Sequence, residues 1–395
     1  MKDDRNQIAA RISKMLQTQH LRKVFFEQQG LQAQSLLDLL QELLDNLPLP
    51  DTRSHLVTVL VRLSRESGLY PERFLLKDVQ IQGQFPLAGG SYGDVWKGSL
   101  DGRVVAVKMM RTYRTQDAGL LKTFAKEAIL WARLSSPYVL PLLGVYCIIE
   151  QVRRVCLVSP WMDNANLSQY LEEHPETNRL SLILDVALGL DYLHSFEPSV
   201  IHGDLKGVNI LITAERRACV ADFGLCILVQ NANIQFTTSS SAHSAGSVHW
   251  MAPELLQVEE STESIRKTCS SDVYAFGCVC FEIYDGRPPF PELNRSQAVL
   301  AIKENRPRPR PAHTSLNDDT WALIQQCLVT DPEARPNAKQ IIQQLKCHPD
   351  VQHHHTPSSW VLPGSNGPVR QDKARPTIGL FTWPRYIWYL LTPDS

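Results

Sequence analysis

The sequence predicts an α+β protein in which a small sheet precedes a larger helical part, behind a helical N-terminal extension. Three observations lead to this prediction. Short β-branched runs lie between residues 78 and 110, helical patterns dominate after about residue 165, and the first 76 residues are rich in Leu and Gln. Strands that come first and helices that follow favour separate layers over alternating ones.

The N-terminal segment, residues 1–76, carries two helical patterns. In the first, leucines recur at helical spacing until Pro48 (Leu36, Leu40, Leu43 and Leu47). In the second, Asp51 or Thr52 is the expected N-cap and Gly68 the expected end (Leu56, Val59, Leu60 and Leu63). These helices either dock on the following domain or bind a regulatory partner, and the sequence leaves both open.

Composition excludes several classes of protein. Of the 395 residues, 43% are hydrophobic and 21% are charged, which excludes disorder throughout. The net charge of −1 gives no global attraction for nucleic acid, and no apolar run reaches the ~20 residues of a transmembrane segment. The nine cysteines include no CxxC pair, and Cys278 and Cys280 are expected as core thiols. We therefore expect a soluble, cytoplasmic protein in a reducing compartment.

The C-terminal segment, residues 349–395, is rich in proline, so we expect a mostly irregular tail. Its three consecutive histidines, residues 353–355, have no Cys or acidic neighbour, which disfavours a metal site. An aromatic cluster between residues 381 and 389 either packs on the folded body or contacts a membrane surface.

A glycine-rich turn lies between two strand patterns. Without side chains at Gly90 and Gly93, backbone N–H groups can approach phosphate oxygens closely. About fifteen residues further on, Lys108 ends an apolar strand, and a buried ammonium needs a counter-charge. The next helical pattern supplies Glu127 as that partner.

This segment resembles the small lobe of a protein kinase. The resemblance implies that Lys108 holds the α- and β-phosphates of ATP and that Glu127 orients it. It also implies an ATP-binding flap made of Leu87, Ala88, Gly89, Gly90, Ser91, Tyr92, Gly93, Asp94 and Val95. Ala88 stands at the first of the three usual glycines, and its single methyl group is expected to permit the turn.

A second cluster, residues 200–211 followed by residues 221–224, resembles the catalytic loop and the metal-binding motif of protein kinases. The resemblance implies that Asp204 is the catalytic base and that Lys206 offsets charge on the γ-phosphoryl group. It also implies that Asn209 and Asp222 hold Mg²⁺, which prefers hard oxygen ligands.

Further landmarks extend the resemblance over about 270 of the 395 residues. Asp272 matches the buried helix aspartate that braces the catalytic loop, and Arg335 matches the arginine that pairs with Glu254. The expected fold is the two-lobed kinase fold within residues 77–348. Its N-lobe covers about 77–160 and its C-lobe about 161–348.

The resemblance also places the adenine pocket. Ser159 is at the gatekeeper position, where a small residue opens a back pocket. The backbone of Met162 faces the adenine edge, while Ala106 and Leu211 pack against the two ring faces. Pro160 is compatible with this segment, because only its carbonyl is required.

The type of kinase follows from the same motifs. Lys206 and Asn209 follow the serine/threonine pattern, and Ser247 stands where such kinases place a hydroxyl. The segment 250–254 resembles the tyrosine-kinase-like group, whose members mostly phosphorylate Ser and Thr. We expect a kinase acting on protein substrates, with a pseudokinase scaffold as the alternative. The scaffold is disfavoured because the strand lysine, the base and the metal ligands are all present.

Position 203 departs from the family pattern. Most protein kinases carry arginine between the His and the Asp of the catalytic loop, and that arginine receives the phosphate of a modified activation segment. Gly203 removes the charge and all five donors. We therefore expect activity without phosphate on residues 224–252, with Arg216 and Arg217 as partial substitutes.

Overall fold

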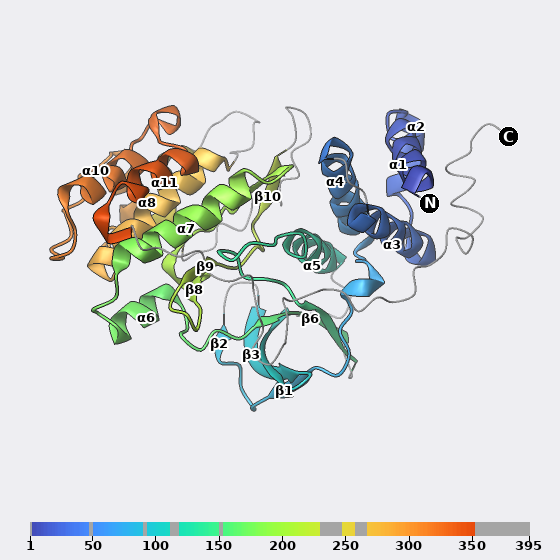
Figure 1. The fold of residues 1–395 in the computed structure, drawn as a ribbon, viewed down its shortest axis with the longest axis horizontal. Helices are drawn as coiled ribbons and strands as arrows, with labels where there is room; N and C mark the ends of the chain where they lie inside the picture. Colours follow the sequence, from blue (N-terminus) through green and yellow to red (C-terminus); the bar gives the residue numbers. More distant parts are fainter. Residues whose placement is uncertain are drawn as a thin grey trace. The chain divides into compact units, whose positions relative to one another are not determined.

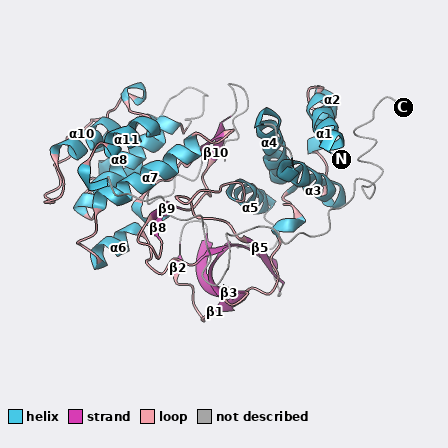
Figure 2. Cartoon of the chain, viewed as in Figure 1, coloured by secondary structure: helices cyan, strands magenta, loops and turns pink. Residues whose placement is uncertain are grey.

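The computed structural model describes residues 2–46, 50–89, 93–110, 118–149, 153–229, 247–256 and 267–351. They belong to two compact units. Of the described residues, the first unit contains those up to 134 together with 141–161, and the second contains 135–140 and those from 162 to 351. The larger sheet belongs to the first unit, while helices dominate the second (Figure 2).

The first unit is built on an antiparallel sheet with strand order β1-β3-β4-β6-β5, in which β2 also pairs with β3. Its strands are β1 (Gln80–Gln82), β2 (Ala88–Gly89), β3 (Gly93–Leu100), β4 (Arg103–Met110), β5 (Gly144–Ile149) and β6 (Arg153–Pro160). Buried side chains of β4 and β6 form the core of the sheet (Val105, Val107, Met109, Cys156 and Val158). The β-branched run that begins at Asp78 predicts a strand as far as Leu87, but β1 ends at Gln82, because Gly83 turns the chain at φ +86° and Pro86 follows.

Four helices precede the sheet in the same unit (Figure 1). They are α1 (Lys2–Met15), α2 (Gln19–Phe26), α3 (Gly30–Asn46) and α4 (Pro50–Ser67). Helix α4 packs against α3 and also against α5 (Ala118–Trp131), so the predicted docking of these helices is present. The predicted N-cap is wrong, since the helix already includes Asp51 and Thr52. The predicted end is confirmed, because Gly68 adopts φ +69°.

The second unit is mainly helical. Its helices are α6 (Leu167–Glu173), α7 (Arg179–His194), α8 (Cys269–Asp285), α9 (Arg295–Lys303), α10 (Asp318–Cys327) and α11 (Ala338–Lys346). Two small antiparallel sheets join β7 (Ser199–Ile201) to β10 (Ile227–Val229) and β8 (Ile210–Ile212) to β9 (Ala218–Val220). Helix α8 is buried along most of its length, including Cys278 and Cys280, as predicted. The antiparallel sheet of the first unit and the helices of the second confirm the predicted α+β class.

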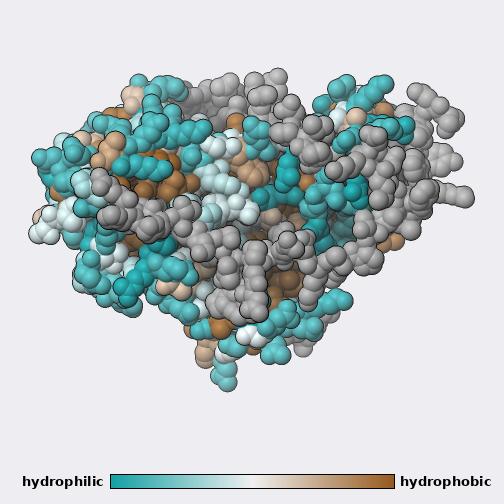
Figure 3. Space-filling model, viewed as in Figure 1, coloured by the Kyte–Doolittle hydropathy of each residue, from teal (hydrophilic) through white to brown (hydrophobic). Residues whose placement is uncertain are grey.

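Hydrophilic side chains cover much of the surface in view in Figure 3. Among the residues that the structure describes, no helix combines the length and the apolar character needed to cross a membrane. The histidine tract and the aromatic cluster of the C-terminal segment lie outside the described residues.

Candidate active site

An ion pair joins the sheet of the first unit to helix α5. Lys108 lies on β4, and its Nζ is 3.0 Å from Oε1 of Glu127 on α5. The side chains are 16% and 2% exposed, so each charge depends on the other for compensation. The pairing predicted from the sequence is therefore present.

The glycine-rich turn is described on both sides of Gly90, Ser91 and Tyr92, which lie outside the described residues. Ala88 pairs with Val95, and the N–H of Leu87 donates to the Val95 carbonyl at 2.9 Å, so the ladder accommodates the alanine. At Gly93 the backbone runs so close to β4 that a Cβ atom would lie 2.5 Å from the Met109 carbonyl oxygen. This close approach explains the glycine at position 93.

Helix α5 is tied to the N-terminal helices at both of its ends. At its start, Leu121 lies next to Gly68, where a Cβ atom would be in ordinary contact at 3.6 Å. Just beyond its end, buried Arg133 donates to the side chain of Gln41 and lies 3.8 Å from Asp45, both on α3. The helix that carries Glu127 is thus held from outside the predicted kinase domain.

Two residues expected around adenine face each other across the sheet. Ala106 on β4 pairs with Ser159 on β6, and Ser159 is buried. The other two expected residues, Met162 and Leu211, belong to the second unit. There Leu211 lies on β8, and its backbone forms an isolated bridge with Asn166.

The predicted catalytic loop gathers its polar side chains around Asp204. Lys206 donates from Nζ to Oδ2 of Asp204 at 2.7 Å and to the hydroxyl of Ser247 at 2.9 Å. Asn209 donates from Nδ2 to the Asp204 carbonyl at 2.8 Å and to its Oδ2 at 3.2 Å. The carboxylate is 7% exposed, so these donors fix its orientation in a largely dry site.

Asp222 follows β9 with φ +65°. The backbone next to it is joined to Asn209, because the N–H of Ala221 donates to the Asn209 carbonyl at 2.9 Å. Since Asn209 uses its amide nitrogen toward Asp204, its side-chain oxygen is left for another partner. An amide oxygen and a carboxylate are the kind of donors that suit Mg²⁺, so these residues fit the ion that the sequence predicts.

Asp272 on α8 supports the backbone of the catalytic loop. Its carboxylate accepts the N–H groups of His202 at 2.7 Å and Gly203 at 2.8 Å, and His194 lies 3.0 Å from Oδ2. Burial opposes the charge on Asp272, but the partnership with His194 holds its pKa below the usual value. Burial likewise opposes the charge on His194, yet the bond to Asp272 raises the pKa of His194 to about 9. The bracing role expected for Asp272 is therefore present in the geometry.

Two further residues, Glu282 and Lys267, support the catalytic loop and are not expected from the sequence. Buried Glu282 on α8 accepts the N–H of Gly207 at 3.0 Å and the indole N–H of Trp250 at 2.9 Å, and burial raises its pKa. A Cβ atom at Gly207 would overlap this carboxylate. Lys267 donates to the carbonyl of Gly203 at 2.6 Å. No local pattern marks either residue, because each reaches the loop only through the fold.

Glu254 and Arg335 form the expected pair at the end of the activation segment. Two parallel hydrogen bonds of 2.7 and 2.8 Å join them, and the Arg335 side chain is completely buried, while Glu254 is 22% exposed.

Arg217, which the sequence predicts as a partial substitute for an arginine at position 203, is bonded to Asp185, to which its Nε donates at 2.8 Å. This bond occupies one of the two arginines predicted to substitute for an arginine at position 203.

Comparison with known proteins gives one consistent result. A family model for protein tyrosine and serine/threonine kinases matches residues 81–345. The chain is 31% identical over 296 residues to the serine/threonine-protein kinase CTR1 of Arabidopsis thaliana, covering 72% of this chain and 34% of CTR1. It is 32% identical over 267 residues to the serine/threonine/tyrosine-protein kinase HT1 of the same plant, covering 66% of this chain and 64% of HT1.

A third relative is the dual specificity protein kinase shkC of Dictyostelium discoideum, 31% identical over 294 residues, with 71% of this chain and 55% of shkC covered. The aligned part spans between 34% and 64% of the length of these three relatives. The matched family model and the geometry around Lys108 and Asp204 lead to the same assignment. The chain belongs to the protein tyrosine and serine/threonine kinase family, in its tyrosine-kinase-like group.

Proposed function

We propose that the chain is an ATP-dependent protein serine/threonine kinase, which transfers the γ-phosphoryl group of ATP to hydroxyl groups of proteins. The observation that supports this most directly is the arrangement at Asp204, whose carboxylate accepts hydrogen bonds from both Lys206 and Asn209. A carboxylate held in this way can orient an attacking hydroxyl and accept its proton.

In this proposal the phosphates and the adenine ring of ATP are contacted by different residues. Lys108, held by Glu127, binds the α- and β-phosphates, and the glycine-rich turn of residues 87–95 covers them. Adenine is bound by four residues (Ala106, Ser159, Met162 and Leu211). Because Lys108 already has a buried partner, it is positioned before the nucleotide arrives.

Charge on the phosphates is balanced by two kinds of group. Lys206 offsets the charge that develops on the transferred γ-phosphoryl group, while it remains bonded to Asp204. Asn209 and Asp222 would hold Mg²⁺, which neutralises the phosphate oxygens when it is bound. In this proposal the chain supplies position and electrostatics, and Asp204 takes the proton of the acceptor hydroxyl.

Two observations favour serine and threonine as acceptors. The bond from Lys206 to Ser247 ties the catalytic loop to the segment that precedes Glu254. The name of CTR1 gives serine/threonine activity alone, while that of HT1 gives tyrosine as well. A kinase-fold scaffold that only binds partners is the alternative. The intact Lys108–Glu127 pair and the bonded Asp204 favour the enzyme.

The test is phosphoryl transfer from ATP to a generic protein substrate by the full chain. We expect Asp204→Asn to lower kcat by about 10²–10⁴-fold. Lys108→Met and Asp222→Asn should abolish transfer without unfolding the chain, because both residues act on bound nucleotide and metal. Lys303→Met, at an exposed position on α9, is the control and should keep the wild-type rate. A folded wild-type chain without transfer from Mg-ATP would favour the scaffold. Folded variants that all retain wild-type turnover would contradict the proposed site.

A further inference from the structure

Gly203 immediately precedes Asp204 and has a positive φ of +75°. Both of its backbone groups are bonded to one end of helix α8. Its N–H donates to Oδ1 of Asp272 at 2.8 Å, and its carbonyl accepts from Nζ of Lys267 at 2.6 Å. Two side chains that lie five positions apart in the sequence thus hold this one residue.

The peptide that joins Gly203 to Asp204 is held at both of its polar ends. Its carbonyl oxygen accepts from Lys267, and its N–H, which belongs to Asp204, donates to Nδ1 of His202 at 3.2 Å. A planar peptide with both ends bonded cannot rotate freely. These bonds therefore constrain the position of the Asp204 Cα atom, from which the carboxylate extends to its partners Lys206 and Asn209.

Glycine at position 203 is what leaves room for Lys267. A Cβ atom there would lie 2.8 Å from Cδ and 3.1 Å from Nζ of the lysine. The first distance is shorter than real Cβ contacts allow, so a larger residue would have to displace the Lys267 side chain. It would also crowd the backbone carbonyl oxygen of Leu225, 3.1 Å away. The left-handed φ also favours glycine at this position. The glycine that stands at position 203 in place of arginine therefore also makes room for the Lys267 side chain.

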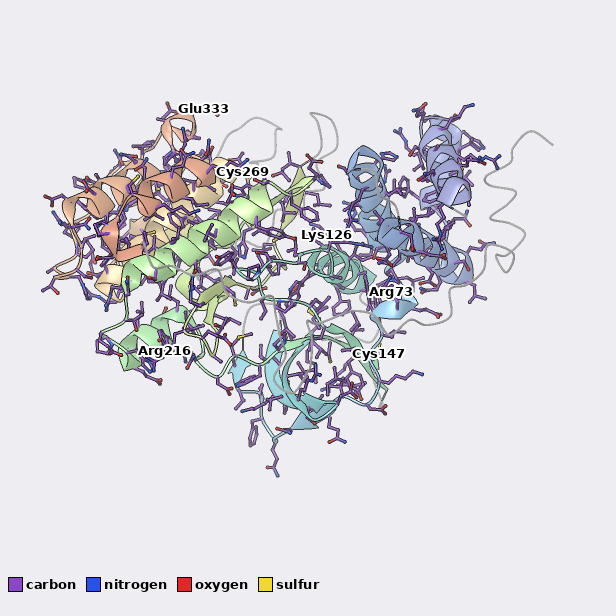
Figure 4. All side chains as sticks on the ribbon, in the orientation of Figure 1. Arg73, Lys126, Cys147, Arg216, Cys269 and Glu333 are labelled. Atoms are coloured by element: carbon purple, nitrogen blue, oxygen red, sulfur yellow. The ribbon has the colours of Figure 1, made fainter. Side chains whose placement is uncertain are left out.

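Lys267 is presented by an ordered part of the backbone. It lies one residue before Thr268, which is the N-cap of α8 and forms a capping box with Ser271. The N–H of Ser271 donates to Thr268 at 3.1 Å, and the N–H of Thr268 donates to Ser271 at 2.9 Å. The labelled Cys269 marks this end of the helix in Figure 4. The helix end that supplies Asp272 therefore also supplies Lys267.

The charge of Lys267 is balanced within the same cluster. Burial lowers its pKa, and the carboxylates of Asp204 and Asp272 oppose that change. A cation at this place attracts the carboxylate that it helps to position. A neutral side chain of similar length would fill the space without this attraction.

We propose that Lys267 is a positioning residue for phosphoryl transfer, which fixes the Gly203–Asp204 peptide and thereby the carboxylate of Asp204. This inference rests on the proposed function, since it assigns Lys267 a role through Asp204. It goes beyond that function by naming a support for the catalytic loop built from this chain's own residues in place of an arginine at position 203.

The test compares Lys267→Met and Lys267→Arg with the wild-type chain, measuring kcat, KM for Mg-ATP and thermal stability. Methionine keeps the length and loses the donor, whereas arginine keeps both donor and charge. We expect Lys267→Met to lower kcat by about ten- to hundredfold, because displacing a reacting group by ~1 Å costs on the order of 10²-fold. KM should change little. Lys267→Arg should recover most of kcat, and the control Lys303→Met should behave as wild type.

Gly203→Ala provides a second approach, because its methyl group displaces Lys267 without removing the charge. A folded Lys267→Met or Gly203→Ala variant with wild-type kcat would overturn the inference. So would an equal loss in Lys267→Met and Lys267→Arg. If Lys267→Met does not fold, Lys267→Gln, which removes the charge and shortens the side chain, takes its place in the comparison with Lys267→Arg. Asp204→Asn is measured in the same assay. If Asp204→Asn stays active, the proposed function is wrong. If Asp204→Asn loses activity while Lys267→Met and Gly203→Ala keep it, the proposed function holds and the role of Lys267 is wrong.

Discussion

Arg335 shows how a single side chain can tie together several segments of the helical unit. Its guanidinium donates to Glu254 through two bonds, and to the carbonyls of Val329, Ser270 and Thr330. All five of its donors are therefore used in a site from which water is excluded. A buried cation that is satisfied in this way cannot lose its partner without a large cost.

We therefore expect Glu254→Ala to destabilise the fold strongly. Removing one partner of a buried pair leaves an uncompensated charge, which costs roughly 3–5 kcal/mol. The 22% exposure of Glu254 places the expected value near the lower end. Denaturant unfolding monitored by circular dichroism measures the change. Glu304→Ala, which breaks the exposed pair with Arg306, is the control and should cost about 0–1 kcal/mol. Equal losses in the two variants would contradict this account.

The His194–Asp272 pair makes stability depend on pH in a definite direction. The pKa of His194 is about 9 in the folded chain, whereas an unfolded histidine has a pKa of about 6.5. Between these two pH values the folded state therefore holds a proton that the unfolded state has lost. Stability from this pair is complete below pH 6.5 and is lost as pH rises toward 9. Cys269 acts in the opposite sense, because its bond to His194 lowers its pKa against the effect of burial.

The prediction is tested in a Cys269→Ser background, which removes the opposing thiol. Raising the pH from 6.5 to 9 should destabilise this chain more than it destabilises the same chain with His194→Gln. The difference should be below about 3 kcal/mol, because Cys269 is one of the groups that raise the pKa of His194. Unfolding free energies at the two pH values give the difference directly. An identical pH dependence with and without His194 would show that its proton does not stabilise the fold.

At the scale of elements, α5 depends on the N-terminal helices for its position. Arg133 is the link at its C-terminal end, where burial lowers the pKa of the guanidinium to about 9 despite the nearby Asp45. The rings of Tyr70 and Phe124 add an edge-to-face contact at 5.9 Å. Because Glu127 lies between these contacts, they also stabilise the position of its carboxylate.

We expect Arg133→Ala to loosen the last turn of α5. The loss leaves Gln41 without this donor and Asp45 without one of its two cations, which costs about 1–3 kcal/mol. Amide hydrogen exchange of residues 128–131 should become at least about tenfold faster, since each factor of ten corresponds to ~1.4 kcal/mol. Lys122→Ala on the same helix is the control. Unchanged exchange in Arg133→Ala would show that α3 does not hold this turn.

The elements differ in how well the sequence predicts them. Strands β3 and β4 and helix α5 follow directly from their apolar patterns, which also carry Lys108 and Glu127. Asp204 follows from the resemblance of residues 200–211 to the catalytic loop of protein kinases. Helix α4 begins before its predicted cap because Pro50 fits the first turn of a helix. Glu282 and Lys267 could not be predicted, because they lie 75 and 64 positions from their partners, Gly207 and Gly203. Only the packing of α8 makes them neighbours.

At the scale of the whole molecule, the chain should be active without phosphate on its activation segment. An added phosphate orders a loop only where cations receive it, and position 203 offers none. Six of the candidate acceptors lie outside the described residues (Thr237, Thr238, Ser239, Ser240, Ser241 and Ser244), and the seventh, Ser247, accepts from Lys206. We expect enzyme treated with phosphatase, with removal verified by intact mass, to keep most of its rate. A loss of more than about tenfold, or ~1.4 kcal/mol of transition-state stabilisation, would contradict this expectation.

The contact between Gly203 and Lys267 also constrains how such a sequence can evolve. Gaining arginine at position 203 first would create a steric overlap and place two cations together. Losing Lys267 first would leave the Gly203 carbonyl without its 2.6 Å donor. Each single step is expected to be harmful and only the double change neutral, so the two sites should show strong epistasis. In homologous sequences, glycine and lysine at these two sites should be inherited together and replaced together.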